Sequence, residues 1–161
     1  MRETDKLNES LARKEQAACR RLLDLHGQCE LNFLMLERVF PDMRLGLRAI
    51  LLAGDSRSST RLEIEVVKRA PYTTHLALHG TLCQVPMAGE LQADIHMYHD
   101  ARMAEVTHSS ANRLINLRNK YPNALMLQPD EKWQANHLVG VWLDYFIKHG
   151  RRAGNNPGQP G

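Results

Sequence analysis

Apolar residues alternate with polar ones over four stretches of this chain, at residues 61–68, 73–79, 94–98 and 102–108. This alternation is typical of antiparallel strands with one buried and one solvated face. Residues 45–53 are apolar apart from Gly46 and Arg48 and form a further expected strand. The pattern therefore predicts an antiparallel sheet of four or five strands.

The N-terminal third has a helical rhythm in two parts. Residues 2–25 place an apolar face on one side of a helix that Gly27 is expected to end, and the face is interrupted by Lys14 and Arg21. The residues of that face are Leu7, Leu11, Ala18, Leu22 and Leu25. Two interpretations stay open: a charged solvated extension, which the broken face favours, and a coiled-coil arm through which two copies form a homodimer.

A second helix is expected from Cys29 to Phe40, stopped by Pro41. Its expected buried positions are Leu31, Leu34, Met35, Val39 and Phe40.

Two helices are expected near the C-terminus. One begins at Ser110 or Asn112 and runs to Tyr121, and the other spans residues 131–149, with Asp130 as its N-cap and Gly150 after its end. The apolar positions of the second helix form more than one stripe, which predicts a helix with protein on most sides. They are Leu138, Val139, Val141, Trp142, Leu143, Tyr145, Phe146 and Ile147, beside a polar strip of His137, Gly140, Asp144 and Lys148.

Together these elements predict an α+β fold, in which N-terminal helices and a central C-terminal helix pack on one face of the sheet. We divide the chain into a charged helical extension at 1–25, one globular domain at 26–150 and a disordered tail at 151–161.

Composition removes several function classes. The chain has 161 residues and a formal net charge of +3, to which Arg151 and Arg152 contribute, so the body lacks the charge that a nucleic-acid partner requires. No stretch has the apolar length of a membrane span or the pattern of a signal peptide. The three cysteines, Cys19, Cys29 and Cys83, include no Cys-x-x-Cys pair, which indicates a reducing, cytoplasmic location without disulfides or a thiolate zinc site.

Short motifs from Leu25 to Gly150 resemble the DUF1249 family of small cytoplasmic gammaproteobacterial proteins. The matching pieces are residues 29–33, 72–74, 98–101, 103–106, 121–123, Gln128, 130–132, Gln134, Asn136, 142–143 and 149–150. The resemblance implies no established activity. Genes of this family often lie beside those of an ADP-ribose hydrolase and a cyclic-AMP phosphodiesterase. The resemblance therefore implies a link to nucleotide metabolism.

The hairpin at residues 94–108 holds the densest group of ionisable residues. Its turn contains His99 and Asp100, the residue types of general acid–base chemistry, and Asp100 is expected to adopt the positive φ of the turn. Arg102 is the best candidate to meet an anionic ligand, because its planar fork suits carboxylate or phosphate. Tyr98 and Glu105 complete this set of candidate ligand-binding residues. The favoured interpretation is nevertheless a structural turn, in which Asp100 accepts backbone hydrogen bonds and Arg102 and Glu105 form ion pairs.

The start of the C-terminal helix is a second candidate site. Lys132 near a helix N-terminus could hold an anion, although capping by Asp130 and Glu131 already satisfies this end. Gln134 and Asn136 follow in the next turn, and they either line a ligand site or bond to an open strand edge.

The solvated sheet face is the third candidate. Alternation places His75, His79 and His96 on it, together with Glu63, Glu65, Asp94 and Tyr98. Histidine and carboxylate are ligands for zinc, nickel or iron, but a loosely paired solvated face is the favoured interpretation, and we predict no metal and no other cofactor.

The leading hypothesis is a non-enzymatic domain that binds a protein or a small anionic ligand. The alternative is an enzyme or regulator of nucleotide metabolism that acts through His99, Asp100 and Arg102. A metal-dependent hydrolase on the histidine face is third. No catalytic residue is assigned, since no nucleophile or phosphate-binding motif occurs.

Overall fold

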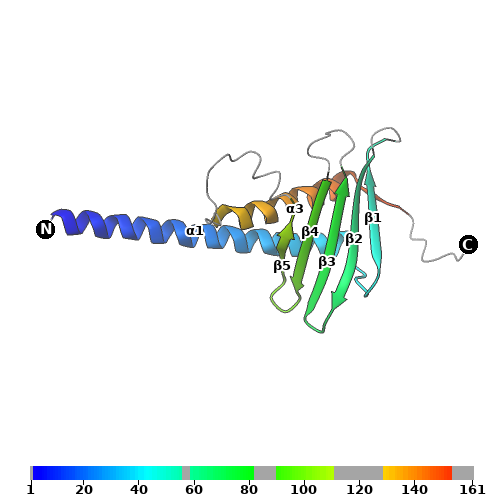
Figure 1. Cartoon of the computed structure of the whole chain (residues 1–161), viewed down its shortest axis with the longest axis horizontal. Helices are drawn as coiled ribbons and strands as arrows, with labels where there is room; N and C mark the ends of the chain where they lie inside the picture. The colour runs from blue at the N-terminus through cyan, green and yellow to red at the C-terminus, as the bar shows by residue number, and fades with distance from the viewer. Residues whose placement is uncertain (1, 56–58, 82–89, 111–128, 154–161) are drawn as a thin grey trace, which may run out of the picture.

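Six antiparallel strands form one sheet in this protein, seen in a computed structural model that describes residues 2–55, 59–81, 90–110 and 129–153 (Figure 1). The strands lie in the order β5-β4-β3-β2-β1-β6. Their bounds are Arg48–Ala53 (β1), Thr60–Arg69 (β2), Thr73–Thr81 (β3), Glu90–Tyr98 (β4), Met103–Ser109 (β5) and Arg151–Arg152 (β6). The predicted α+β class and antiparallel sheet are confirmed.

The count of six strands corrects the expected four or five. The extra strand is β6, in which Arg151 pairs with Leu52 and Arg152 with Leu51. Arg151 and Arg152 were expected in a disordered tail. The strand was missed because two residues are too few to show an alternating pattern. Arg152 also donates to the carbonyl of Val39 (Nη2 to O, 3.1 Å), which ties the segment to the first helix.

Two helices, α1 (Arg2–Val39) and α3 (Pro129–His149), cover one face of the sheet (Figure 1). The side chains under them include Leu62, Ile64, Val66, Leu76, Leu78, Leu91, Ala93, Ile95, Met97, Ala104 and Val106, all buried. Most of these side chains lie in the stretches predicted by alternation, while Leu91 and Ala93 belong to a part of β4 that begins before the predicted strand at residue 94. At Gly80 of β3 an added Cβ would collide with the Trp142 ring of α3, so only glycine fits there.

α1 is one continuous helix, and the predicted break at Gly27 is wrong. An added Cβ at Gly27 would meet nothing within 4 Å, so the glycine lies in the open on the helix surface. A single helical glycine costs only about 1 kcal/mol, which downstream packing offsets. The buried face is also shifted, because Asn32, Phe33 and Leu36 are buried. Leu31 and Leu34, expected in the core, are about half exposed.

The last helix ends at His149 before Gly150, as predicted, but two expectations about it are wrong. Protein does not surround it, since Val141 and Tyr145 are exposed. Gly140 does not lie in a solvated polar strip. It faces α1, where an added Cβ would lie 2.5 Å from Gln28 Nε2 and 2.9 Å from Asn32 Oδ1, so glycine allows the two helices to approach closely.

Several predictions lie outside the described residues. They are the helix expected as far as Tyr121, the role of Cys83 and the end of the tail. In the part of the chain that is described, no helix is both long enough and apolar enough to cross a membrane.

Candidate functional site

The turn between β4 and β5 is fixed to the rest of the molecule through His99. Its backbone N–H donates to the carbonyl of Tyr72 (2.9 Å), and its ring Nε2 lies 2.7 Å from Thr74 Oγ1. The imidazole also meets the ring of Phe33 of α1 edge-on, with centroids 6.0 Å apart. Asp100 Oδ1 instead accepts a hydrogen bond from the N–H of Ala101 (2.9 Å). The two side chains therefore have separate partners and do not form a dyad.

Arg102 is the residue of this turn with positive φ, at 53°, and not Asp100 as expected. A left-handed conformation costs a non-glycine residue about 1–2 kcal/mol. The Arg102 side chain offsets part of this cost, because its guanidinium carbon lies 5.6 Å from the Phe33 ring centroid and its Nη2 lies 3.9 Å from Glu37 Oε2. These contacts support the structural interpretation of the hairpin, in which Arg102 fastens the turn to α1.

Asn136 connects α3, α1 and the free edge of β5, and its side chain is fully buried. Its Oδ1 accepts from the N–H of Val106 (3.0 Å) and lies 3.7 Å from Cys29 Sγ. Its Nδ2 donates to the carbonyl of Lys132 (2.8 Å), while Asn32 Nδ2 donates to the Asn136 carbonyl (3.0 Å). Of the two roles considered for Asn136, bonding to an open strand edge is the observed one.

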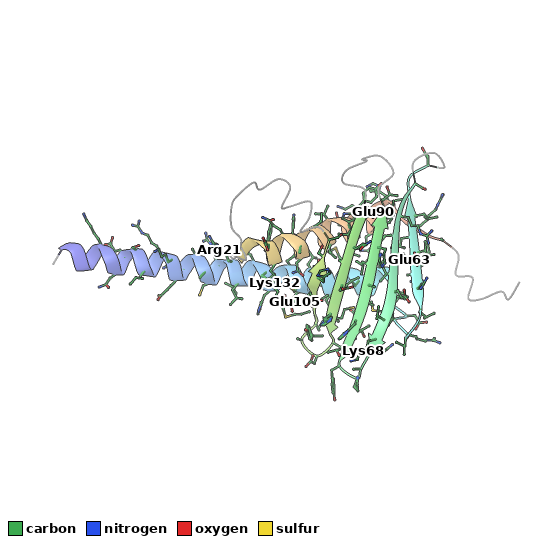
Figure 2. The ribbon with its side chains drawn as sticks, viewed as in Figure 1. Arg21, Glu63, Lys68, Glu90, Glu105 and Lys132 are labelled. Atoms are coloured by element: carbon green, nitrogen blue, oxygen red, sulfur yellow. The ribbon has the colours of Figure 1, made fainter. Side chains whose placement is uncertain are left out.

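Glu105 and Lys132 form an ion pair beside this network, between β5 and α3 (Figure 2). The hydrogen bond that Lys132 donates to the Glu105 carboxylate raises the pKa of Lys132, so the ammonium stays charged. Burial, with a smaller contribution from Glu105, raises the pKa of the nearby Cys29 thiol to about 11. Cys29 is therefore a protonated packing residue at neutral pH and not a nucleophile.

The sheet face opposite the helices carries the predicted polar residues. His75 and His96 are direct cross-strand neighbours, and their rings stack with centroids 3.7 Å apart and planes 12° apart. Tyr98 meets His96 edge-on at 6.4 Å. Desolvation, followed by the charges of His96 and Lys68, lowers the pKa of His75. The structure thus brings together two of the three candidate histidines.

His79 lies away from this pair, opposite Gln92, four residues along β3 from His75. That separation is about 13 Å in a strand, which is too far for one metal ion to bridge. Among the described residues no group of three or more His, Cys, Asp or Glu is arranged to hold a metal. The carboxylates of Glu63 and Glu65 are instead ion-paired with Arg48 (3.4 and 3.1 Å).

A cleft of about 590 Å³ lies where α3 begins against α1. Sequence reasoning named Gln134 as a candidate ligand-binding residue but missed the cleft. The lining residues are Ala18, Arg21, Leu22, Asp24, Leu25, Trp133 and Gln134. The apolar face at residues 18–25 was visible in the sequence, but the break expected at Gly27 separated it from the buried face downstream.

N-terminal to this cleft, α1 continues past the sheet and past α3 (Figure 1). We call residues 6–24 the arm; all of its described side chains are exposed, including Leu11 at 49% and Leu22 at 56%. Its apolar positions repeat the buried ones at an offset of 11 residues: Ala18 precedes Cys29, and Leu22 precedes Phe33. Eleven residues are three full helical turns, so the buried stripe of α1 runs on along the uncovered arm.

The family model of DUF1249, described as a protein of unknown function, matches residues 35–152. The chain belongs to this family. The resemblance stated on short motifs is thereby confirmed. The DUF1249 match takes in the sheet, α3 and the end of α1, while the arm lies outside it.

Relatives of this DUF1249 chain include the uncharacterized protein YqiB of Escherichia coli strains K12, O6:H1 and O157:H7. Each is 29% identical to it over 125 residues, which cover 78% of this chain and 87% of the relative. No solved structure matches the chain.

Proposed function

We propose that this protein is a non-enzymatic binding domain that holds a helical segment of a protein on the arm of α1. The observation that carries the proposal is the stripe that is buried from Cys29 onward and uncovered between Leu11 and Leu22. Most of the stability of a helix in a protein comes from packing of its apolar face rather than from helix propensity. A partner helix on this stripe supplies that packing, in a cytoplasmic setting indicated by the cysteine usage.

The contacts of the other candidate residues support this proposal. His99, Arg102, Glu105 and Asn136 each have a partner within the molecule, and these contacts hold the hairpin against β3 and the two helices. The cleft, in contrast, is lined by leucine and tryptophan side chains together with Arg21, Asp24 and Gln134. A mixture of large apolar and polar side chains is the usual composition of a protein-binding surface.

Site-specific photo-crosslinking in cells tests the proposal. A photoreactive amino acid replaces Leu22 on the arm or, as the matched control, the exposed His79 on the open sheet face. We expect a covalent protein adduct from position 22 and none from position 79. The absence of an adduct at position 22, or an equal yield at both positions, would contradict the proposal.

A small-ligand function linked to nucleotides is the second candidate, and one observation favours it. The stacked pair of His75 and His96, with Tyr98 beside it, is a ready platform for a planar ring, and Lys68 lies next to His75. A thermal-shift screen with nucleotides and ADP-ribose tests this candidate, since a ligand at 100 times its Kd stabilises by about 2.7 kcal/mol. A shift that is lost in His96→Ala supports this function, and a flat screen removes it.

A further inference from the structure

We infer that the occupant of the arm is the arm of a second copy of this chain, packed antiparallel. The inference rests on the proposed binding function of the arm and names its partner. Two observations carry it: the place where α3 begins, and the charge distribution along the arm.

The start of α3 decides the direction. From Leu25 onward the apolar stripe of α1 is covered by the sheet and α3, which together we call the body. Trp133 and Gln134, in the first turns of α3, line the cleft there. A parallel second copy would place its own body against this one, because both bodies begin at the same level of α1. An antiparallel copy places its body beyond the free end of the arm, so the two bodies stay apart.

The same geometry fixes the register. The second copy's arm can extend along this stripe until its first turn meets α3, level with Leu22 and Leu25. Figure 2 shows Arg21 at this level of α1, beside the start of α3. In that register helix position 7 of the second copy is level with position 18, and position 3 of the second copy is level with positions 21 and 22. The overlap of about 20 residues is about 30 Å long, which is short and predicts a weak, concentration-dependent dimer.

Charge favours this antiparallel register. Residues 3–9 hold three acidic side chains and one basic one, a net charge of −2. Residues 13–21 hold four basic side chains and one acidic one, a net charge of +3. Antiparallel packing places the acidic part of each arm opposite the basic part of the other, whereas parallel packing places like charges together. Complementary charge at such flanking positions is what sets partner and orientation in paired helices.

Charge exchange in the purified full-length chain tests the inference, with sedimentation equilibrium from low to high micromolar concentration as the readout. We expect a reversible dimer whose dissociation constant rises roughly tenfold in Arg21→Glu, since two symmetric ion pairs become repulsive. The double variant Glu3→Arg/Arg21→Glu restores the pairs and returns the constant to near its original value. Arg20→Glu is the matched control, because Arg20 lies about 200° around the helix from Ala18 and should leave the dimer unchanged.

Each other result overturns the inference. If the chain stays monomeric at every concentration, a second copy does not cover the apolar stripe of the arm. The occupant is then a different protein or residues of the same chain outside the described part. A dimer that is insensitive to Arg21→Glu, or equally sensitive to Arg20→Glu, associates elsewhere or through net charge alone. The proposed binding function is judged separately by the crosslinked adduct at position 22, which has twice the mass of the chain only when the partner is a second copy.

Discussion

Asn136→Ala should be among the most damaging single substitutions in this protein. The side chain is 0% exposed, and its Oδ1 is the acceptor for the N–H of Val106 on the free edge of β5. The substitution leaves that buried N–H without a partner, which costs about 1–3 kcal/mol. Removal of the amide group also leaves a small cavity between α1 and α3, at about 1 kcal/mol more. We therefore expect a loss of about 2–4 kcal/mol in the free energy of unfolding.

Urea denaturation followed by circular dichroism measures this loss, on the condition that the m-value is unchanged. Gln134→Ala is the matched control: Gln134 lies on the same helix and lines the cleft, and it is only half buried. We expect the control to change stability by less than about 0.5 kcal/mol. Hydrogen exchange gives a second readout, since the amide of Val106 should lose protection in Asn136→Ala. A loss under about 1 kcal/mol with unchanged protection would refute the role given to Asn136.

Three further predictions concern the hairpin, the helix contact and the histidine pair. Arg102→Gly should stay within about 0.5 kcal/mol of the original stability in urea unfolding, because relief of the left-handed backbone offsets the lost side-chain contacts, whereas Arg102→Ala should lie about 1 kcal/mol below it. Gly27→Ala should raise the free energy of unfolding by about 0.5–1 kcal/mol, because the added Cβ meets nothing and alanine favours the helix. Gly140→Ala should lower it by about 1–3 kcal/mol, because its Cβ would collide with Gln28 and Asn32 of α1. Equal effects would contradict the helix packing. NMR titration should find the pKa of His75 below its ordinary value and rising in His96→Asn. Because the folded-state pKa is lowered, the neutral form of His75 stabilises the fold at pH values above about 6.5, and this contribution should be lost as the pH falls below that value.

The sheet could be predicted from the sequence because alternation depends on local side-chain sorting. Residues such as Leu62 and Ile64 face the helices, while Glu63 faces solvent, as the two-residue period requires. β6 could not be predicted, because two consecutive arginines show no alternation of apolar and polar residues. They pair with β1 because the end of α3 lies beside that edge of the sheet. The break expected at Gly27 failed for a related reason: helix propensity is local and weak, and packing of Phe33 and Leu36 overrides it.

The roles of the candidate site residues depended on the three-dimensional arrangement. The sequence placed Asn136 one turn into the last helix, yet its acceptor role becomes visible only when the edge of β5 lies beside it. Arg102 was singled out for an anion, but its nearest groups are Phe33 and Glu37, which are more than 60 residues away in the chain. The cleft needed an uninterrupted α1, and so could not be found while that helix was divided.

The distance between two arms in solution tests the central claim most directly. Cys19 is an exposed thiol on the arm, whereas Cys29 is buried with a raised pKa, so in a Cys83→Ser variant a thiol-reactive spin label reports on position 19. Double electron–electron resonance on this singly labelled chain detects only distances between copies. The antiparallel register predicts a distance of roughly 20–25 Å, from an axial offset of about 12–15 residues and a helix spacing of 8–10 Å. Parallel arms would bring the labels to about 10 Å, the helix spacing, and would be detected as dipolar broadening of the continuous-wave spectrum. The absence of both this broadening and a dipolar modulation at high concentration would contradict pairing of the arms altogether.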